Sequence, residues 1–157
     1  MIAMAILGNP GLLIADEPTT ALDVTIQAQI LELLKELRKK KGLSVLLITH
    51  NIGILEDMAD SVAVMFKGRV IEYCDIGTFF KNPLHPYTIE LINNVPKAGF
   101  NKVRLGIARE KEKDKIRLLS RCAYLNRCNK SNAICMREES SFIEVGKNHF
   151  VNCLMAG

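Results

Sequence analysis

The chain has 157 residues, of which 48% are hydrophobic and 24% are charged, as in ordinary globular proteins. Its net charge of +4 is too small to indicate nucleic acid as a partner, and no apolar run approaches the roughly 18 residues that cross a bilayer. Residues 1–7 lack the basic leader of a secretory signal. We therefore expect a cytosolic protein with one core, which reaches a membrane only through partners.

The first predicted elements are the end of a helix over residues 1–7 and a short strand after Pro10. The apolar run 12–15 is too short for a helix and is framed like a buried strand. It ends in two carboxylates, Asp16 and Glu17. Ligands bind beyond the carboxyl ends of strands in open α/β sheets, so this pair is suited to hold a divalent metal and to orient or deprotonate a water.

A helix is predicted next, over residues 24–40, with Asp23 as its N-cap and Gly42 after its end. Its apolar residues share one helical stripe, which should pack on the sheet: Ile26, Ile30, Leu33, Leu34 and Leu37. Residues 44–49 form a second apolar run, predicted as a buried strand that ends at His50.

These segments together resemble the ATPase subunit of an ATP-binding cassette (ABC) transporter. The resemblance is carried by the apolar run with Asp16-Glu17-Pro18-Thr19, by Ala21-Leu22-Asp23 and by Thr49-His50. It implies an α/β fold, a partial sheet of the P-loop NTPase type with its helices. It also implies that Asp16 holds Mg²⁺ through water, Glu17 is the catalytic base, Asp23 belongs to the D-loop that contacts a partner, and His50 contacts the terminal phosphate of ATP.

Two motifs of that family do not occur in this sequence, namely the P-loop pattern GxxxxGK with Ser or Thr and a signature of the LSGGQ type. The P-loop supplies the backbone N–H groups and the lysine that cradle phosphates. The resemblance therefore implies the carboxy-terminal half of a subunit, inactive alone. The implied partners are a second ATPase subunit, two membrane permease subunits and an extracytoplasmic peptide-binding protein. The implied location is peripheral, at the cytoplasmic face of the cell membrane.

The middle of the chain is predicted to form a hairpin and short helices. Asn51 should cap a short helix, and residues 62–73 should form a β-hairpin with its turn at Lys67-Gly68. Thr78 should cap a further helix, and Pro86 should begin another that runs to about residue 94. The string Asn-Pro-Leu-His-Pro-Tyr-Thr at 82–88 resembles the oligopeptide/dipeptide branch of these importers.

Four of the five cysteines lie in the tail: Cys122, Cys128, Cys135 and Cys153. In a cytosolic chain such clustering favours metal over disulfides. The spacing fits neither a two-residue zinc knuckle nor a bacterial ferredoxin run, so an iron–sulfur cluster, zinc and unliganded thiols all stay open. The spacing also resembles the tail of oligopeptide/dipeptide importer ATPases, some of which hold a [4Fe–4S] cluster there.

We accordingly divide the chain into three segments: 1–82, half of an ATPase domain; 83–119, a branch-specific extension and charged linker; and 120–157, a cysteine-cluster tail. The first hypothesis is a fragment of an ATPase subunit that couples ATP binding and hydrolysis to oligopeptide or dipeptide uptake. A non-catalytic metal- or iron–sulfur-binding interaction module and an inert gene fragment are the alternatives. The sequence does not specify the transported substrate.

Overall fold

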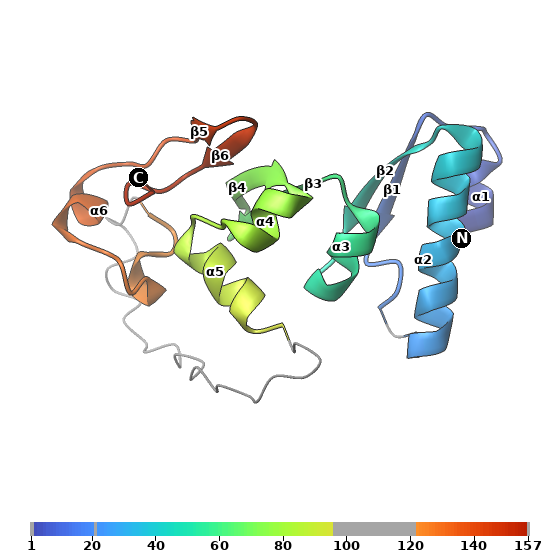
Figure 1. Cartoon of the computed structure of the whole chain (residues 1–157), viewed down its shortest axis with the longest axis horizontal. Coiled ribbons are helices and arrows are strands. Elements are labelled where there is room, and N and C mark those ends of the chain that lie inside the picture. Colours follow the sequence, from blue (N-terminus) through green and yellow to red (C-terminus); the bar gives the residue numbers. More distant parts are fainter. Residues whose placement is uncertain (1, 21, 96–121, 157) are drawn as a thin grey trace. The chain divides into compact units, whose positions relative to one another are not determined.

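The computed structural model is a mixed α/β structure, as predicted, and describes residues 2–20, 22–95 and 122–156 (Figure 1). Within these ranges no helix is both long and apolar enough to cross a membrane. The linker predicted before residue 119 lies outside the described residues.

The chain divides into two compact units, Met1–Met58 and Ala59–Gly157. The division into the functional segments 1–82, 83–119 and 120–157 stays a prediction.

The first unit is built on two parallel strands, β1 (Leu12–Asp16) and β2 (Ser44–Ile48), which pair along their whole length. Helix α2 (Val24–Lys41) connects them, as the crossover between parallel strands requires. The remaining elements of the unit are α1 (Ile2–Ile6), η1 (Ile52–Ile54) and α3 (Leu55–Met58). The two predicted strands and the predicted helix between them are confirmed.

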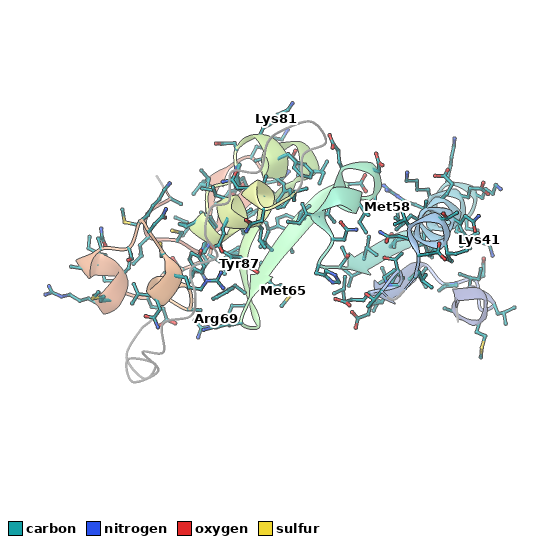
Figure 2. The ribbon with its side chains drawn as sticks, turned by 90° about the horizontal axis from the view of Figure 1, so that it is seen from below. Lys41, Met58, Met65, Arg69, Lys81 and Tyr87 are labelled. Atoms are coloured by element: carbon teal, nitrogen blue, oxygen red, sulfur yellow. The ribbon has the colours of Figure 1, made fainter. Side chains whose placement is uncertain are left out.

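Helix α2 begins and ends where its capping residues predict. An Asp23 carboxylate oxygen accepts a hydrogen bond from the Ile26 backbone N–H at 2.9 Å. At the other end, beyond Lys41 (Figure 2), Gly42 takes a left-handed conformation with φ of +63°. A side chain at this position would be strained, so glycine ends the helix at low cost.

The core of the first unit lies between α2 and the two strands. Leu13, Leu34 and Leu43 are buried, and partly buried residues pack against them: Ile30, Leu37, Val45 and Met58. Ile26 and Leu33 were expected on the same buried stripe but are 39% and 43% exposed. The two-stranded sheet is too narrow to cover the whole stripe.

The two strands are buried on one face only. Leu13 and Ala15 face the core, whereas Leu12, Ile14, Leu46 and Ile48 are exposed to 52%, 60%, 50% and 46%. The prediction of fully buried strands is therefore wrong for this second face. Parallel sheets are normally covered on both faces, so four large apolar side chains on one face form a surface suited to a further layer.

The second unit contains a four-stranded antiparallel sheet in the order β3-β4-β6-β5. Its strands are β3 (Ser61–Phe66), β4 (Arg69–Asp75), β5 (Ile143–Gly146) and β6 (His149–Val151). The predicted hairpin is confirmed, with positive φ of 48° at Lys67 and 78° at Gly68, as a tight hairpin turn requires. Figure 2 labels Met65 and Arg69 beside this turn.

Short helices flank this sheet: α4 (Ile76–Lys81), α5 (Pro86–Asn93), η3 (Leu125–Arg127) and α6 (Ala133–Arg137). The predicted start of α5 at Pro86 is confirmed. The cap of α4 is Asp75 and not Thr78 as predicted, because Asp75 accepts the Thr78 backbone N–H at 2.9 Å. The helix begins three residues earlier than a Thr78 cap predicts, which makes the Thr78 N–H one of the donors that the cap satisfies.

Candidate functional site

The first candidate site lies where β1 and β2 end. Asp16 pairs with Ile48 at the last position of the parallel ladder, and the Glu17 backbone N–H donates to the Ile48 carbonyl at 2.9 Å. Glu17 takes a left-handed conformation with φ of +44°, which is uncommon for a residue other than glycine. Such backbone strain is concentrated at functional sites, and here it turns the chain sharply just after the strand.

The Glu17 carboxylate is held by two side chains. Its Oε1 lies 2.9 Å from His50 Nδ1, and its Oε2 accepts a hydrogen bond from the Thr20 hydroxyl at 2.8 Å. Two hydrogen bonds hold the pKa of Glu17 below its ordinary value. The bond with His50 has the larger effect and the bond with Thr20 the smaller one. The group is therefore an ionised, oriented carboxylate that solvent reaches, since 43% of its side chain is exposed.

The structure thus brings together two of the four residues that sequence reasoning assigned to this site. Glu17 and His50 are in contact, and exposed Asp16 precedes Glu17 at the end of β1. Asp23 caps α2 through its carboxylate. Thr20 was missed, although a hydroxyl three residues after an acid is a familiar local partner.

The second candidate site is a cavity in the second unit. All four tail cysteines line it: Cys122, Cys128, Cys135 and Cys153. Burial raises the pKa of the Cys128 and Cys153 thiols, and the charges of the other cysteines in this group add to the effect. A bound metal would have to displace protons from these thiols, so its affinity would rise with pH.

His85 and Tyr124 also line this cavity. His85 is the N-cap of α5, because its Nδ1 accepts the Tyr87 backbone N–H at 3.0 Å. Its ring lies against Tyr124, with 5.7 Å between the ring centroids. Burial lowers the pKa of His85 to about 4, so the imidazole is neutral at physiological pH.

The residues between the cysteines attach the tail to α5 and the hairpin. Glu90 on α5 accepts hydrogen bonds from the Tyr124 hydroxyl and, at 2.7 Å, from Arg127. Tyr124 also packs edge-on against Phe66 and Tyr87. Tyr124 and Arg127 both lie between Cys122 and Cys128, so the segment that contacts α5 and the hairpin also carries two of the cavity cysteines.

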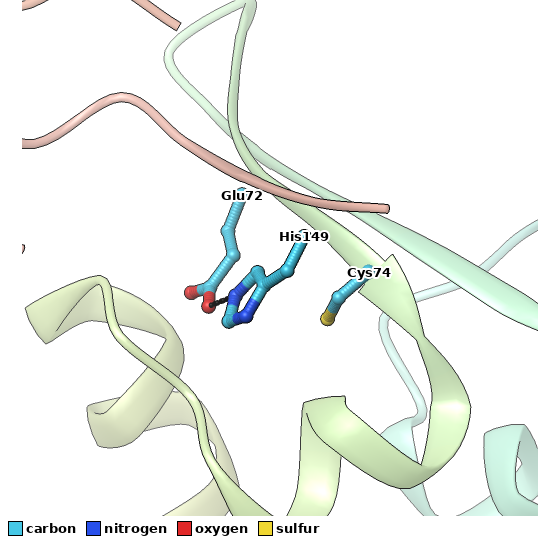
Figure 3. A group of neighbouring side chains, drawn as sticks. All are labelled: Glu72, Cys74 and His149. Atoms are coloured by element: carbon cyan, nitrogen blue, oxygen red, sulfur yellow. Dashed lines mark hydrogen bonds and ion pairs between the residues drawn. The ribbon is translucent and has the colours of Figure 1, made fainter. Parts of the chain in front are cut away.

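A third group was missed by sequence reasoning altogether. Glu72 on β4 is completely buried, and its Oε1 lies 2.8 Å from His149 Nε2 on β6 (Figure 3). The backbone N–H groups of Leu84 and His85 donate to its two carboxylate oxygens at 2.8 and 3.0 Å. The one available signal was a lone acid inside an otherwise apolar strand, where a charge needs a partner.

Cys74 completes this group, because its sulfur and the ligand atoms of Glu72 and His149 lie within 4.8 Å of one another. However, both Glu72 oxygens already accept backbone N–H groups. Burial, with the charges of Glu72 and Asp75, raises the pKa of Cys74 to about 12, so the thiol stays protonated. We therefore interpret the group as a closed hydrogen-bonded network that joins β4, β6 and the start of α5.

Comparisons with known proteins agree with the motifs. Residues 71–135 match the family described as oligopeptide/dipeptide transporter, C-terminal region. Residues 2–56 match a model for an AAA domain, whose description refers to AbiEii toxin of Type IV TA systems.

Curated relatives cover nearly the whole chain. The oligopeptide transport ATP-binding protein AppD of Bacillus subtilis is 41% identical over 99% of this chain and 47% of its own length. The dipeptide transport ATP-binding protein DppD of the same organism is 42% identical over 98% of this chain and 46% of its own length. The oligopeptide transport ATP-binding protein OppD of Lactococcus lactis is 55% identical over 62% of this chain and 29% of its own length.

The chain belongs to the ATP-binding subunits of ABC peptide importers and corresponds to their carboxy-terminal part. It spans about half the length of AppD and DppD. The residues that match the AAA-domain model also lie within the part of the chain that these relatives cover. The alternative of a separate interaction module has no comparable support.

Proposed function

We propose that this chain is part of an ATP-binding subunit that couples ATP binding and hydrolysis to the uptake of oligopeptides or dipeptides. The observation that carries the proposal is the Glu17–His50 contact at the ends of β1 and β2, in a chain 41% identical to AppD over 99% of its length. The proposed partners are a second such subunit, two membrane permease subunits and an extracytoplasmic peptide-binding protein. The proposed location is the cytoplasmic face of the cell membrane.

We assign one role to each site residue. Glu17 orients and deprotonates the water that attacks the terminal phosphate, and its lowered pKa keeps it ionised for that role. His50 contacts that phosphate and fixes the Glu17 carboxylate. Asp16 holds Mg²⁺ through water, as a carboxylate at a strand end can. Asp23 contacts the second subunit, while its carboxylate caps α2.

The proposal requires a phosphate cradle that this sequence does not supply. The printed chain contains no GxxxxGK pattern followed by Ser or Thr. The exposed apolar face of β1 and β2 is where such a segment would pack, because Leu12, Ile14, Leu46 and Ile48 have no covering layer within the described residues. We expect that a segment carrying the P-loop covers this face and completes the sheet.

A joined subunit tests this proposal. The part of AppD that this chain does not match, which we expect to carry the P-loop, is fused in frame before residue 1, and phosphate release from ATP is measured. We expect hydrolysis by this joined subunit and none by the 157-residue chain alone, since the cradle is absent from the chain. A joined subunit without its P-loop lysine is the control. Turnover by the isolated chain that disappears in Glu17→Gln would contradict the proposal.

For the tail we propose that the four cysteines hold a [4Fe–4S] cluster, with zinc as the alternative. All four line one cavity, and thiolate ligands suit both metals. A tetrahedral zinc with Zn–S bonds of about 2.3 Å would hold its sulfurs about 3.8 Å apart. Among the described residues, the one group of three or more ligand atoms within 4.8 Å of one another is Glu72, Cys74 and His149. The four tail sulfurs do not form such a group in the described residues, so they are not arranged as a closed zinc tetrahedron.

Anaerobic purification tests the cofactor proposal. We expect the wild-type chain to contain iron and acid-labile sulfide, and Cys135→Ser to lose them because one of four ligands is removed. Cys74→Ser is the matched control, since this buried cysteine lies outside the cavity lining and should not affect metal content. Stoichiometric zinc without iron would support the zinc site in place of the cluster. A metal-free wild-type chain would contradict both the cluster and the zinc site.

A further inference from the structure

His85 is the one histidine that lines the cavity of the four cysteines, and it does so from the start of α5. It is 2% exposed, so its imidazole is cut off from solvent. Three contacts fix its position. Its backbone N–H donates to Glu72 at 3.0 Å, its Nδ1 accepts from the Tyr87 N–H at 3.0 Å, and its ring packs against Tyr124.

The hydrogen bond at Nδ1 determines where the proton of the imidazole lies. A nitrogen that accepts a backbone N–H carries no proton, so the ring of His85 is neutral and its single proton is on Nε2. Within the described ranges no acceptor for this Nε2–H is found, although the ring is buried. Because His85 lines the cavity, an acceptor that binds there can receive this N–H.

The chemistry of the cavity identifies that acceptor. Its wall contains four cysteine sulfurs, which become negatively charged thiolates when they bind a metal. A thiolate or a cluster sulfide accepts hydrogen bonds, and hydrogen bonds to these sulfurs tune the reduction potential of iron–sulfur clusters. A donor held in a fixed position by a helix cap is suited to this role, because little rotamer freedom is lost when the hydrogen bond forms.

We infer that His85 is a positioning residue of the cysteine site, whose Nε2–H donates a hydrogen bond to a sulfur of the bound metal centre. This inference rests on the cofactor proposed above. It assigns the histidine of the His-Pro-Tyr string two functions, since Nδ1 caps α5 and Nε2 serves the metal centre. It also links occupancy of the cysteine site to the network around Glu72, which holds the His85 backbone.

Two substitutions in the full chain separate the two nitrogens. In His85→Asn the side-chain oxygen replaces Nδ1 and keeps the helix cap, but no donor reaches the position of Nε2. In His85→Gln the longer amide places an N–H near the position of Nε2 and gives up the cap. Both variants lose the ring contact with Tyr124, so that loss cancels when they are compared.

The readouts are the reduction potential of the anaerobically purified cluster and the affinity for Co²⁺ as a spectroscopic probe of the thiolates. We expect His85→Asn to shift the potential to more negative values, because the reduced, more negative centre loses a donor. We also expect it to weaken Co²⁺ binding by roughly 10–100-fold, as for other residues that support metal ligands. His85→Gln should stay close to wild type in both readouts while melting at a lower temperature.

The outcomes separate this inference from the proposal on which it rests. A wild-type chain that takes up neither cluster nor Co²⁺ overturns both. A wild-type chain that binds them, with unchanged potential and affinity in His85→Asn, overturns the role of His85 alone. If both variants lower the affinity equally, the effect comes from the lost ring contact, and the inference is also overturned.

Discussion

We expect Glu17→Gln to lower ATP turnover by the joined subunit roughly 10²–10⁴-fold, the usual contribution of a positioned general base. The amide has the same size as the carboxylate and can still accept a hydrogen bond from Thr20, but it cannot take up a proton. Because the contact with His50 holds the pKa of Glu17 low, the wild-type group is available as a base down to acidic pH. Steady-state phosphate release measures the loss, and equilibrium nucleotide binding should change little.

The matched control for this substitution is Glu36→Gln in the same joined subunit. Glu36 is an exposed carboxylate on α2 that pairs with Lys40 at 2.7 Å, and its pKa is also lowered by that hydrogen bond. The chemical change is identical, yet it lies away from the ends of β1 and β2, so turnover should stay at the wild-type level. Full activity of Glu17→Gln would show that Glu17 is not the catalytic base.

We expect His149→Ala to destabilise the second unit by about 1–3 kcal/mol, because a completely buried acceptor loses one hydrogen-bond partner. Glu72 is completely buried and would keep only the backbone donors of Leu84 and His85. Urea unfolding followed by far-ultraviolet circular dichroism measures the loss. Hydrogen exchange at the β4 and β6 amides should localise it, since the two strands pair at Glu72 and Val151.

Two further variants make the stability experiment specific. Lys40→Ala removes the exposed ion pair with Glu36 and should leave the unfolding midpoint almost unchanged, because surface pairs contribute little. Glu72→Gln should also lower the stability, since its amide NH2 would face one of the two backbone N–H groups that donate to the Glu72 carboxylate. An unfolding midpoint of His149→Ala equal to that of wild type would show that the pair does not hold β6 in place.

Several elements could be predicted because their signals are local. The N-cap Asp23 and the glycine at position 42 define α2, and the Lys67-Gly68 turn defines the hairpin. Each of these signals depends on one or two residues and on backbone conformations that few residue types adopt. The motif residues Glu17 and His50 could be chosen because they match motifs of the family, and because each lies within two residues of the end of a recognisable strand.

Other features depended on the partners that each segment finds in the folded chain. Thr78 and Asp75 are both good capping residues, and only the actual start of α4 decided between them. The alternation of buried and exposed residues in β1 could not be predicted from the sequence. A continuous apolar run is the same whether one face of the strand or both faces are covered. Whether a side chain of the strand is exposed depends on the layer that packs against it, and the sequence of the strand does not specify that layer.

By itself the sequence determined the family, the strand–helix–strand order of the first unit and the identity of the four cysteines as a group. Tertiary structure decided that Glu17 contacts His50, that Glu72 meets His149 across 77 residues, and that His85 shares a cavity with the cysteines. The physical reason is that capping, turn and periodicity signals are short-range. A buried polar group, in contrast, pairs with a group that the folded chain places beside it, and that partner can be far away in the sequence.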